Sequence, residues 1–287
     1  MVHEFAPAKV NLCLHITGRR ADGYHLLDSL VVFAGVGDEL TFTRAETHAL
    51  EISGPFSGAI DAAPDNLIFK AAHLLGDQVP GAAVSLTKSV PVAAGIGGGS
   101  ADAAASLRGL TRLYELKDLD AGQLDEMALT LGADVPACLR SRALRMTGIG
   151  EEISEIQEFA PLPAVLVNPG VPVPTGPIFK ALGLAQPGTA GTGLEDLHRQ
   201  SFRSVGDVVD WLGGQRNDLQ APAIALAPAV GQVLEALERE AACRLARMSG
   251  SGATCFGLFD SDEQAAACAA RLARAHPGWW VRPTTLS

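Results

Sequence analysis

The most informative part of this chain is Pro91-Val92-Ala93-Ala94-Gly95-Ile96-Gly97-Gly98-Gly99-Ser100-Ala101-Asp102, in which glycine fills four of five successive positions. Apolar residues at a period of two precede it over 84–90, and apolar residues at helical spacing follow it over 103–114. This pattern predicts a strand, a loop and a helix, with Ser100 as the N-cap. Glycines bring backbone N–H groups close to an oxyanion, and a helix N-terminus adds its dipole. The segment therefore predicts a site for a nucleotide phosphate.

Two commoner glycine motifs do not fit this segment. A dinucleotide fingerprint requires a third glycine where this chain has Ser100, and a Walker A loop requires a lysine at the helix entrance, where none occurs. A flexible glycine loop without a ligand is the remaining alternative. The strand and helix patterns on either side favour the phosphate site.

The composition limits the class of protein. The 287 residues include 22 basic and 32 acidic side chains, for a formal net charge of −10. This balance gives no basic surface, so we predict neither nucleic acid nor a membrane as a partner. Five cysteines are scattered singly, and no apolar run is long enough to cross a membrane. These features predict a soluble cytoplasmic protein with reduced thiols.

The order of predicted elements indicates an α+β fold in two domains. Strand patterns over 8–16, 26–34 and 40–43 are followed by helix patterns and the glycine segment. The acidic run 151–158 predicts a solvated connector, so we divide the chain into domains 1–150 and 151–287. In the second domain, helices over 221–240 and 263–275 alternate with strands, which predicts a small α+β sandwich.

The run from Gln186 to Gly193 is rich in proline and glycine and predicts a mobile surface loop. The sequence leaves open whether this loop closes over a ligand. A second glycine turn, 248–254, separates two strand patterns. It is either a simple strand connection or a second wall facing a phosphate.

Several polar residues interrupt apolar patterns. Lys9 and Asn11 share one face of the first predicted strand, and Asp134 lies in a segment that is unusually apolar for a solvated turn. Each is either an ordinary exposed residue or a group that faces a ligand. Tyr24 and His25 are either packing and surface residues or two rings that bind a planar base.

Taken together, these residues resemble the GHMP kinases over nearly the whole chain. Besides the glycine segment, the matching motifs are Pro7-Ala8-Lys9-Val10-Asn11-Leu12, Arg19-Arg20-Ala21-Asp22-Gly23-Tyr24-His25, Leu131-Gly132-Ala133-Asp134-Val135-Pro136, Asn168-Pro169-Gly170-Val171-Pro172-Val173-Pro174-Thr175 leading to Phe179, and Ser249-Gly250-Ser251-Gly252-Ala253-Thr254. The glycine segment alone indicates the superfamily. The Ala-Asp-Gly-Tyr-His and Asn-Pro-Gly-Val motifs indicate members that act on a cytidylated substrate.

The resemblance implies a GHMP kinase two-domain architecture, with an N-terminal domain of the ribosomal protein S5 domain 2-like type and a ferredoxin-like C-terminal domain. It implies an enzyme that transfers the γ-phosphoryl group of ATP, with Mg²⁺, to the 2-hydroxyl group of 4-diphosphocytidyl-2-C-methyl-D-erythritol in the non-mevalonate isoprenoid pathway. A cytoplasmic monomer or homodimer with a small-molecule substrate is then expected. Two alternatives stay open: a GHMP kinase for homoserine or a mevalonate derivative, and a non-catalytic nucleotide-binding module.

The resemblance also assigns roles to matching residues. Asp134 is expected to be the general base and Lys9 its partner, which suits a reaction governed by positioning and charge stabilisation. In the substrate site, two aromatic rings are expected to sandwich the cytosine, a histidine to bond its edge, and two polar side chains to contact substrate oxygens. These residues are Tyr24 and Phe179, His25, and Asn11 and Thr175.

The expected ATP-binding residues are those of the glycine segment and two residues near the adenine. They are Pro91, Val92, Ala93, Ala94, Gly95, Ile96, Gly97, Gly98, Gly99, Ser100, Ala101, Asn66 and Lys88. Ala101 stands where many relatives have a second serine, which leaves Ser100 as the expected hydroxyl ligand of Mg²⁺.

Overall fold

The computed structural model describes residues 1–184, 187–194 and 197–287, which form two compact units interleaved along the sequence. Unit 1 comprises Met1–Lys9, Val36–Val92 and Gly97–Ser141, and unit 2 comprises Val10–Gly35, Ala93–Ile96 and Arg142–Ser287. The units interleave because two long strands, β1 (Val2–Arg19) and β2 (His25–Arg44), each contribute to both. The division into 1–150 and 151–287 stays a prediction.

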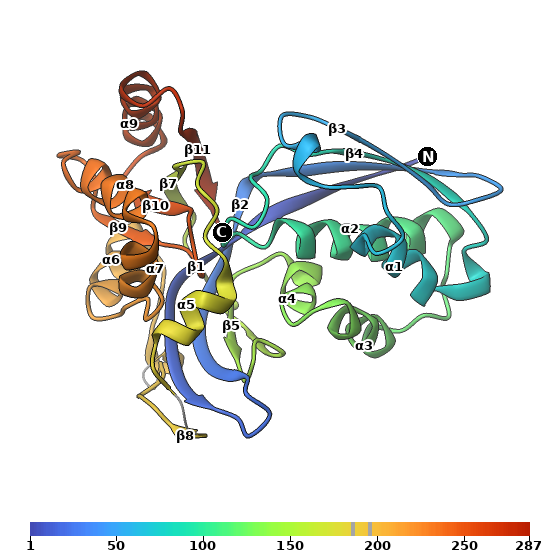
Figure 1. Cartoon of the computed structure of the whole chain (residues 1–287), viewed down its shortest axis with the longest axis horizontal. Helices are drawn as coiled ribbons and strands as arrows, with labels where there is room; N and C mark the ends of the chain where they lie inside the picture. The colour runs from blue at the N-terminus through green and yellow to red at the C-terminus, as the bar shows by residue number, and fades with distance from the viewer. Residues whose placement is uncertain (185–186, 195–196) are drawn as a thin grey trace. The chain divides into compact units, whose positions relative to one another are not determined.

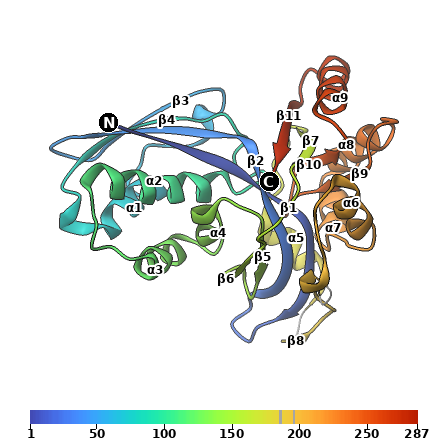
Figure 2. The same ribbon diagram turned by 180° about the vertical axis from the view of Figure 1, so that it is seen from behind.

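Unit 1 is a sheet with helices on one face (Figures 1 and 2). In the sheet, β4 (Ala82–Thr87) is parallel to β3 (Ala49–Ser53) and antiparallel to the second half of β2. The helices that pack together below it are α1 (Leu67–Leu74), α2 (Gly98–Tyr114), α3 (Ala121–Leu131) and α4 (Val135–Arg140). Two short 3₁₀ turns, Ser57–Ala59 and Gly76–Gln78, connect the strands and helices.

The α2 helix follows the glycine segment, as the sequence pattern predicts, but it begins earlier than expected. Its N-cap is Gly97 in the left-handed conformation, with φ 61°, and Ser100 is the third residue of the helix. The prediction of Ser100 as the N-cap is therefore wrong. Glycine adopts this conformation at little cost. The helix therefore begins directly after Gly97, and no side chain caps it. Farther along, Gly109 lets the helix approach the sheet, since a Cβ there would lie 2.4 Å from the ring of Phe42.

Two predictions for the β-strands are wrong. The patterns over 26–34 and 40–43 belong to the single strand β2, in which Gly37 is needed for close packing rather than for a turn. A Cβ on Gly37 would lie 2.2 Å from the carbonyl oxygen of Ala6. The acidic connector contains a strand, β6 (Glu152–Glu155), which pairs with β5 (Leu144–Thr147). The pairing is backbone to backbone, so it tolerates exposed glutamates.

Unit 2 contains a ferredoxin-like sheet with the strand order β11-β7-β10-β9. The strands are β7 (Leu162–Asn168), β9 (Leu245–Met248), β10 (Cys255–Leu258) and β11 (Trp280–Leu286), and each neighbouring pair is antiparallel. Helices connect the first strand to the second and the third to the fourth, which is the β-α-β-β-α-β arrangement. This order confirms the predicted ferredoxin-like domain.

The helices of unit 2 differ in part from the prediction. They are α5 (Thr175–Ala181), α6 (Val205–Gly213), α7 (Gln220–Leu226), α8 (Pro228–Glu238) and α9 (Asp262–Ala275), with a 3₁₀ turn at Leu197–Arg199. The single helix predicted over 221–240 is wrong, because Pro228 starts a new helix after a break at Ala227. Proline lacks the N–H group that a continuous helix needs.

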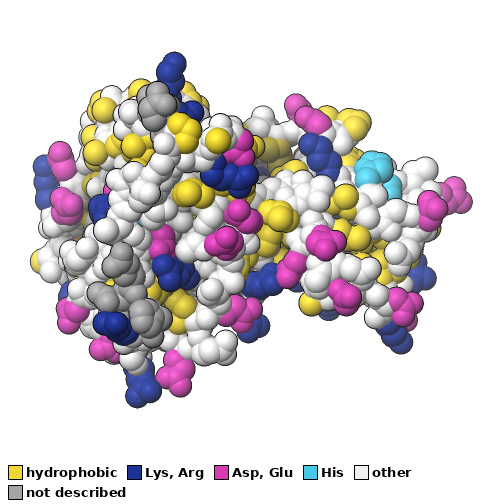
Figure 3. Space-filling model, turned by 90° about the horizontal axis from the view of Figure 1, so that it is seen from below, with side chains coloured by type: hydrophobic (Ala, Val, Ile, Leu, Met, Phe, Trp, Pro, Cys, Tyr) yellow, Lys and Arg dark blue, Asp and Glu magenta, His cyan; other side chains and the backbone are white. Residues whose placement is uncertain are grey.

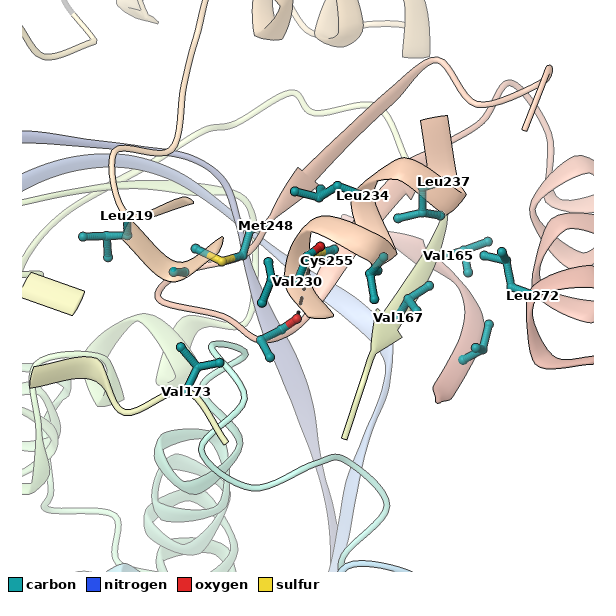
Figure 4. Close-up of a cluster of buried hydrophobic side chains, with 14 of the residues drawn as sticks. Val165, Val167, Val173, Leu219, Val230, Leu234, Leu237, Met248, Cys255 and Leu272 are labelled. Carbon is teal, nitrogen blue, oxygen red and sulfur yellow. Dashed lines mark hydrogen bonds between the residues drawn. The ribbon is translucent and has the colours of Figure 1, made fainter. Parts of the chain in front are cut away.

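The core of unit 2 lies between its sheet and its helices (Figure 4). Val230, Leu234 and Leu237 of α8 gather with Val165 and Val167 of β7. All five side chains are at most 5% exposed. Burial of this apolar surface is the main stabilising contribution that holds α8 on the sheet.

The segment that follows α5 was predicted to be a mobile loop. Its first residue, Gln186, lies outside the described residues, but the described part is bonded to unit 2. There, β8 (Gly188–Thr189) pairs with the end of β1, and the N–H group of Leu194 donates to Asp28 Oδ2 at 2.7 Å. The Thr192 carbonyl lies 3.3 Å from Nδ1 of His15. This part is thus a hydrogen-bonded segment rather than a free loop.

His15 makes this attachment sensitive to pH. Burial lowers its pKa below the usual value of about 6.5, and Arg216 acts in the same direction, while Asp218 and Asp28 oppose it. The neutral ring uses both nitrogens, because the N–H group of Arg216 donates to Nε2 at 3.3 Å. A histidine whose pKa is lower when folded stabilises the fold above its unfolded pKa, and this contribution is lost as the pH falls from the unfolded pKa through the lower folded pKa.

We therefore expect the free energy of unfolding to decrease as the pH falls below about 6.5, and to decrease less in His15→Gln. Urea denaturation at several pH values measures this dependence. His3→Gln, at an exposed position, is the control. An unchanged pH dependence in His15→Gln contradicts the prediction.

Candidate active site

The glycine segment has an unusual backbone. Ala93, Gly95 and Gly97 have positive φ angles of 51°, 73° and 61°. Left-handed residues at alternate positions turn successive N–H groups toward one side, where they bind anions. The segment leads directly into α2, and the N–H groups of its first turn have no acceptor within the helix. The backbone of the segment therefore suits a phosphate, and phosphate binding itself stays a prediction.

The side chains of the segment contribute little to such a site. Pro91, Ala94, Ile96 and Ala101 are buried, so their side chains are not available to a ligand. Ser100 is half-buried in the first turn of α2. Its hydroxyl fits a Mg²⁺ ion that takes its other ligands from phosphate and water, which is the usual manner of Mg²⁺ binding. Among the described residues, no group of three or more His, Cys, Asp or Glu side chains is arranged to hold a metal ion.

The second glycine turn packs against this segment within unit 2. The hydroxyl group of Ser249 donates to the Gly95 carbonyl at 2.9 Å and accepts from the Asn11 N–H group at 3.1 Å. The N–H group of Thr254 donates to the Ala94 carbonyl at 3.1 Å. Ser249 thus holds the loop, a role that the sequence pattern did not assign to it.

Gly95 has no room for a side chain. A Cβ would lie 2.5 Å from the Ser249 carbonyl oxygen and 2.6 Å from the Gly252 nitrogen, and the positive φ adds strain. We expect Gly95→Ala to raise the KM for ATP by about tenfold or more, because the loop must shift. Gly213→Ala is the matched control, since a Cβ there meets no atom within 4 Å. An unchanged KM in Gly95→Ala contradicts the role of this loop.

Lys9 and Asp134, predicted as a catalytic pair, lie together in unit 1. Lys9 Nζ is 2.9 Å from Asp134 Oδ1. The lysine side chain is 5% exposed, whereas the aspartate side chain is 40% exposed and accessible to a ligand. The lysine stem also lies against the start of α2, since a Cβ on Gly97 would be 3.1 Å from Lys9 Cβ. A carboxylate and an ammonium thus adjoin the predicted phosphate site.

A pocket of about 880 Å³ in unit 2 brings together four of the five predicted substrate residues, Tyr24, His25, Thr175 and Phe179. The rings of His25 and Phe179 are stacked, with centroids 4.9 Å apart. Tyr24 is 60% exposed. The Thr175 hydroxyl lies 2.9 Å from that of Ser251, in the second glycine turn. The charged residues that line the pocket are Arg19 and Lys180, and both are cations.

His25 has an unsatisfied nitrogen in this pocket. Its Nε2 is buried and has no hydrogen-bond partner within the described part of the chain. Burial lowers the pKa of His25 below its usual value, and the charge of Arg19 acts in the same direction. The ring therefore stays neutral at pH 7, with an unused polar atom beside an aromatic face. This combination suits a planar, uncharged base.

Asn11, the fifth predicted substrate residue, does not line this pocket. Its side chain is 3% exposed, and its Nδ2 donates to Ser29 Oγ at 2.8 Å. Ser29 in turn donates to the Cys13 carbonyl at 2.6 Å. Contact between Asn11 and substrate oxygens stays a prediction. The sequence pattern did not single out Ser29, because a serine inside an apolar strand carries no distinctive signal.

A smaller pocket of about 210 Å³ in unit 1 joins four predicted ATP-binding residues, Asn66, Lys88, Val92 and Gly99. Asn66 is the N-cap of α1 and accepts from the Ile68 N–H group at 3.0 Å. The Lys88 ammonium is buried and donates to two carboxylates. Lys88 thus lines the pocket, while its ammonium group pairs with two carboxylates inside unit 1.

On the face shown in Figure 3, basic and acidic side chains are interspersed among uncharged ones. None of the described helices is both long and apolar enough to span a membrane.

Comparison with known proteins agrees with this fold. The model "GHMP kinases N terminal domain" matches residues 66–142, and "GHMP kinases C terminal" matches residues 194–278. These ranges include the glycine segment, Asp134 and the second glycine turn. The fold is thus that of the GHMP kinase class, and the resemblance and the predicted α+β class are confirmed.

Relatives of known name narrow the class. A protein of Paramagnetospirillum magneticum named 4-diphosphocytidyl-2-C-methyl-D-erythritol kinase is 51% identical to this chain, and the match covers 98% of this chain and 97% of the relative. A protein of the same name from Roseobacter denitrificans is 50% identical, and the match covers 100% of this chain and 94% of the relative. A crystal structure of 4-(cytidine 5'-diphospho)-2C-methyl-D-erythritol kinase is similar with a TM-score of 0.77 and 33% identity, over 99% of both chains. The chain belongs to the family of these kinases.

More distant structures share the fold alone. A homoserine kinase from Cytophaga hutchinsonii has a TM-score of 0.66 at 19% identity, over 99% of this chain and 94% of its own. The L. major mevalonate kinase has a TM-score of 0.62 at 16% identity, over 100% and 96%.

Proposed function

We propose that this protein transfers the γ-phosphoryl group of ATP to the 2-hydroxyl group of 4-diphosphocytidyl-2-C-methyl-D-erythritol, in isoprenoid precursor biosynthesis. The main supporting observation is the ion pair between Lys9 and Asp134, at 2.9 Å, against the start of α2. Phosphoryl transfer requires an oriented acceptor and charge stabilisation rather than covalent chemistry by the protein. The relatives described above are named as kinases of this compound, which supports the choice of substrate.

The glycine segment holds the phosphates of ATP in this proposal. Its backbone N–H groups and the N-terminus of α2 bind the oxygens, so the acidic chain needs few cationic side chains there. The small pocket around Asn66 and Lys88 takes the adenine. Ser100 helps to hold Mg²⁺, which neutralises phosphate charge when bound.

Asp134 acts as the general base. Its exposed carboxylate accepts the proton of the substrate hydroxyl while that oxygen bonds to the γ-phosphorus and the bond to ADP breaks. Lys9 orients the carboxylate through the 2.9 Å contact and offsets negative charge that develops at the acceptor.

The larger pocket binds the cytidine. The stacked rings of His25 and Phe179, together with Tyr24, provide flat surfaces for the base. In this proposal, the buried Nε2 of His25, which has no hydrogen-bond partner among the described residues, gains the edge of the base as its partner. A kinase for homoserine or a mevalonate derivative has no ring to place there, so these residues favour the cytidylated substrate.

The decisive experiment combines the protein with ATP, Mg²⁺ and the cytidylated substrate, and follows ADP release and product by ³¹P NMR. Cytidine diphosphate, homoserine and mevalonate replace the substrate as controls. We expect phosphorylation of the cytidylated alcohol alone. Comparable phosphorylation of homoserine or mevalonate indicates another GHMP kinase, and ATP binding without phosphorylation indicates a non-catalytic module. The proposed form in the cytoplasm is a monomer or homodimer.

A further inference from the structure

A cluster of three buried charges lies inside unit 1. Lys88 Nζ donates to Asp38 Oδ2 at 2.5 Å and to Asp102 Oδ2 at 2.6 Å. The exposed fractions of the three side chains are 2%, 0% and 6%. We call these residues the Lys88 cluster. It places two carboxylates against one ammonium, away from solvent.

The Lys88 cluster joins the segments before and after the glycine segment. Asp38 belongs to β2, and its other oxygen accepts from the N–H groups of Ser89 and Val90, at 2.6 and 3.1 Å, in the turn that leads into the glycines. Asp102 lies on α2, which leads out of them. The cluster therefore determines the spacing between the two ends of the loop.

The ammonium of the cluster lies beneath the first turn of α2. A Cβ on Gly98 would lie 3.2 Å from Lys88 Nζ, so the helix start rests directly on this group. Lys88 and Asp102 also line the small pocket, together with Asn66 and Gly99. One cluster thus contacts both the predicted phosphate site and the predicted adenine site.

Stability alone does not account for these charges. Removing charges from water is costly, and apolar residues of similar size often stabilise a protein core equally well. In addition, Asp102 Oδ1 is buried without a hydrogen-bond partner among the described residues, which is unfavourable in itself. The buried charges of the Lys88 cluster lower the stability of the fold or add little to it, but their bonds have defined directions. They are therefore better suited to holding the neighbouring backbone in place than to stabilising the core.

We propose that Asp38, Lys88 and Asp102 are positioning residues that set the start of α2 and the wall of the nucleotide pocket, and so determine the affinity for ATP. This inference rests on the proposed function for its kinetic readout. The affinity for ATP, measured as a Kd by calorimetry, tests it even without turnover.

The first test is Asp102→Asn, which keeps the shape of the side chain and removes its charge. We expect the KM and Kd for ATP to rise by about five- to tenfold, with the KM for the cytidylated substrate unchanged within about twofold. The control is Glu4→Gln. Glu4 is a buried acid that pairs with Arg108 and Arg112, also on α2, at 3.0 and 2.5 Å. The Glu4→Gln variant should have a lower melting temperature and an unchanged affinity for ATP.

The second test separates positioning from stability. The double variant Lys88→Met, Asp102→Leu replaces two of the three charges by apolar side chains and leaves Asp38, whose Oδ1 still accepts from the N–H groups of Ser89 and Val90. It should recover part of the thermal stability that Lys88→Met alone loses, because one buried carboxylate then lacks a cation instead of two. We expect its Kd for ATP to stay at least about fivefold above that of the wild type. It also provides a folded protein if Asp102→Asn is unstable.

Three results overturn the inference: an unchanged Kd for ATP in Asp102→Asn, an equal rise in the KM of both substrates, or recovery of the wild-type Kd in the double variant. Failure of the proposed function has a different signature. In that case the wild type binds ATP but does not phosphorylate the cytidylated substrate.

Discussion

Replacing Asp134 by asparagine is expected to lower kcat by about 10²- to 10⁴-fold, the usual contribution of a positioned general base. Asparagine has the same shape and can still accept the bond from Lys9 Nζ, which is 2.9 Å away, but it cannot take up the proton of the hydroxyl group. The KM for ATP and the KM for the cytidylated substrate should therefore change little. Steady-state and single-turnover rates measure the effect on the chemical step.

The matched control for this variant is Asp125→Asn. Asp125 is also an aspartate of unit 1 in an ion pair, with Arg140 of α4, at 2.7 and 2.6 Å. Its removal should affect stability slightly and kcat hardly at all. Undiminished phosphoryl transfer in Asp134→Asn removes this residue from the role of base. A large rise in KM with normal kcat assigns it to binding instead.

Phe179→Ala is expected to have the largest effect on substrate binding. Stacking of a base on an aromatic ring contributes about 1–3 kcal/mol, which corresponds to a rise in KM of roughly 5- to 150-fold. The loss also frees the ring of His25, whose centroid lies 4.9 Å from that of Phe179. The KM for ATP should stay close to that of the wild type, because Phe179 belongs to the pocket of unit 2 and not to the glycine segment.

Inhibition by cytidine diphosphate provides an independent measure, since its inhibition constant should rise in parallel with the KM for the substrate. Phe159→Ala is the control, because Phe159 also lies in an aromatic pair of unit 2, with Phe202 at 5.4 Å, and does not line the pocket. An increase in the KM for ATP alone, or equal effects of the two variants, contradicts the proposed cytidine site.

Local features were predictable where one segment contains all the information. The apolar spacing of 103–114 predicts α2, and Asn66 is the expected N-cap of α1. The position of the α2 N-terminus was not predictable in the same way. Ser100 is the better N-cap by residue type, but the left-handed Gly97 ends the loop first.

The candidate site required the resemblance and then the structure. Lys9 and Asp134 are 125 positions apart, and nothing in their local sequence indicates that they form a pair. The Lys88 cluster was missed altogether as a unit. Asp38, an aspartate in the middle of a long strand, is the signal that could have indicated it, although it does not identify the partner.

The amino-acid sequence was sufficient for the alternation of strands and helices, the glycine loops and the family to which the chain belongs. These depend on backbone hydrogen bonds, on apolar periodicity and on residue types at neighbouring positions. Which charges meet, which oxygen of Asp102 stays unpaired and which rings stack follows only from the folded chain. Electrostatic and stacking energies depend on distances between atoms in space and on their exclusion from water, and distant segments acquire both together when the core forms.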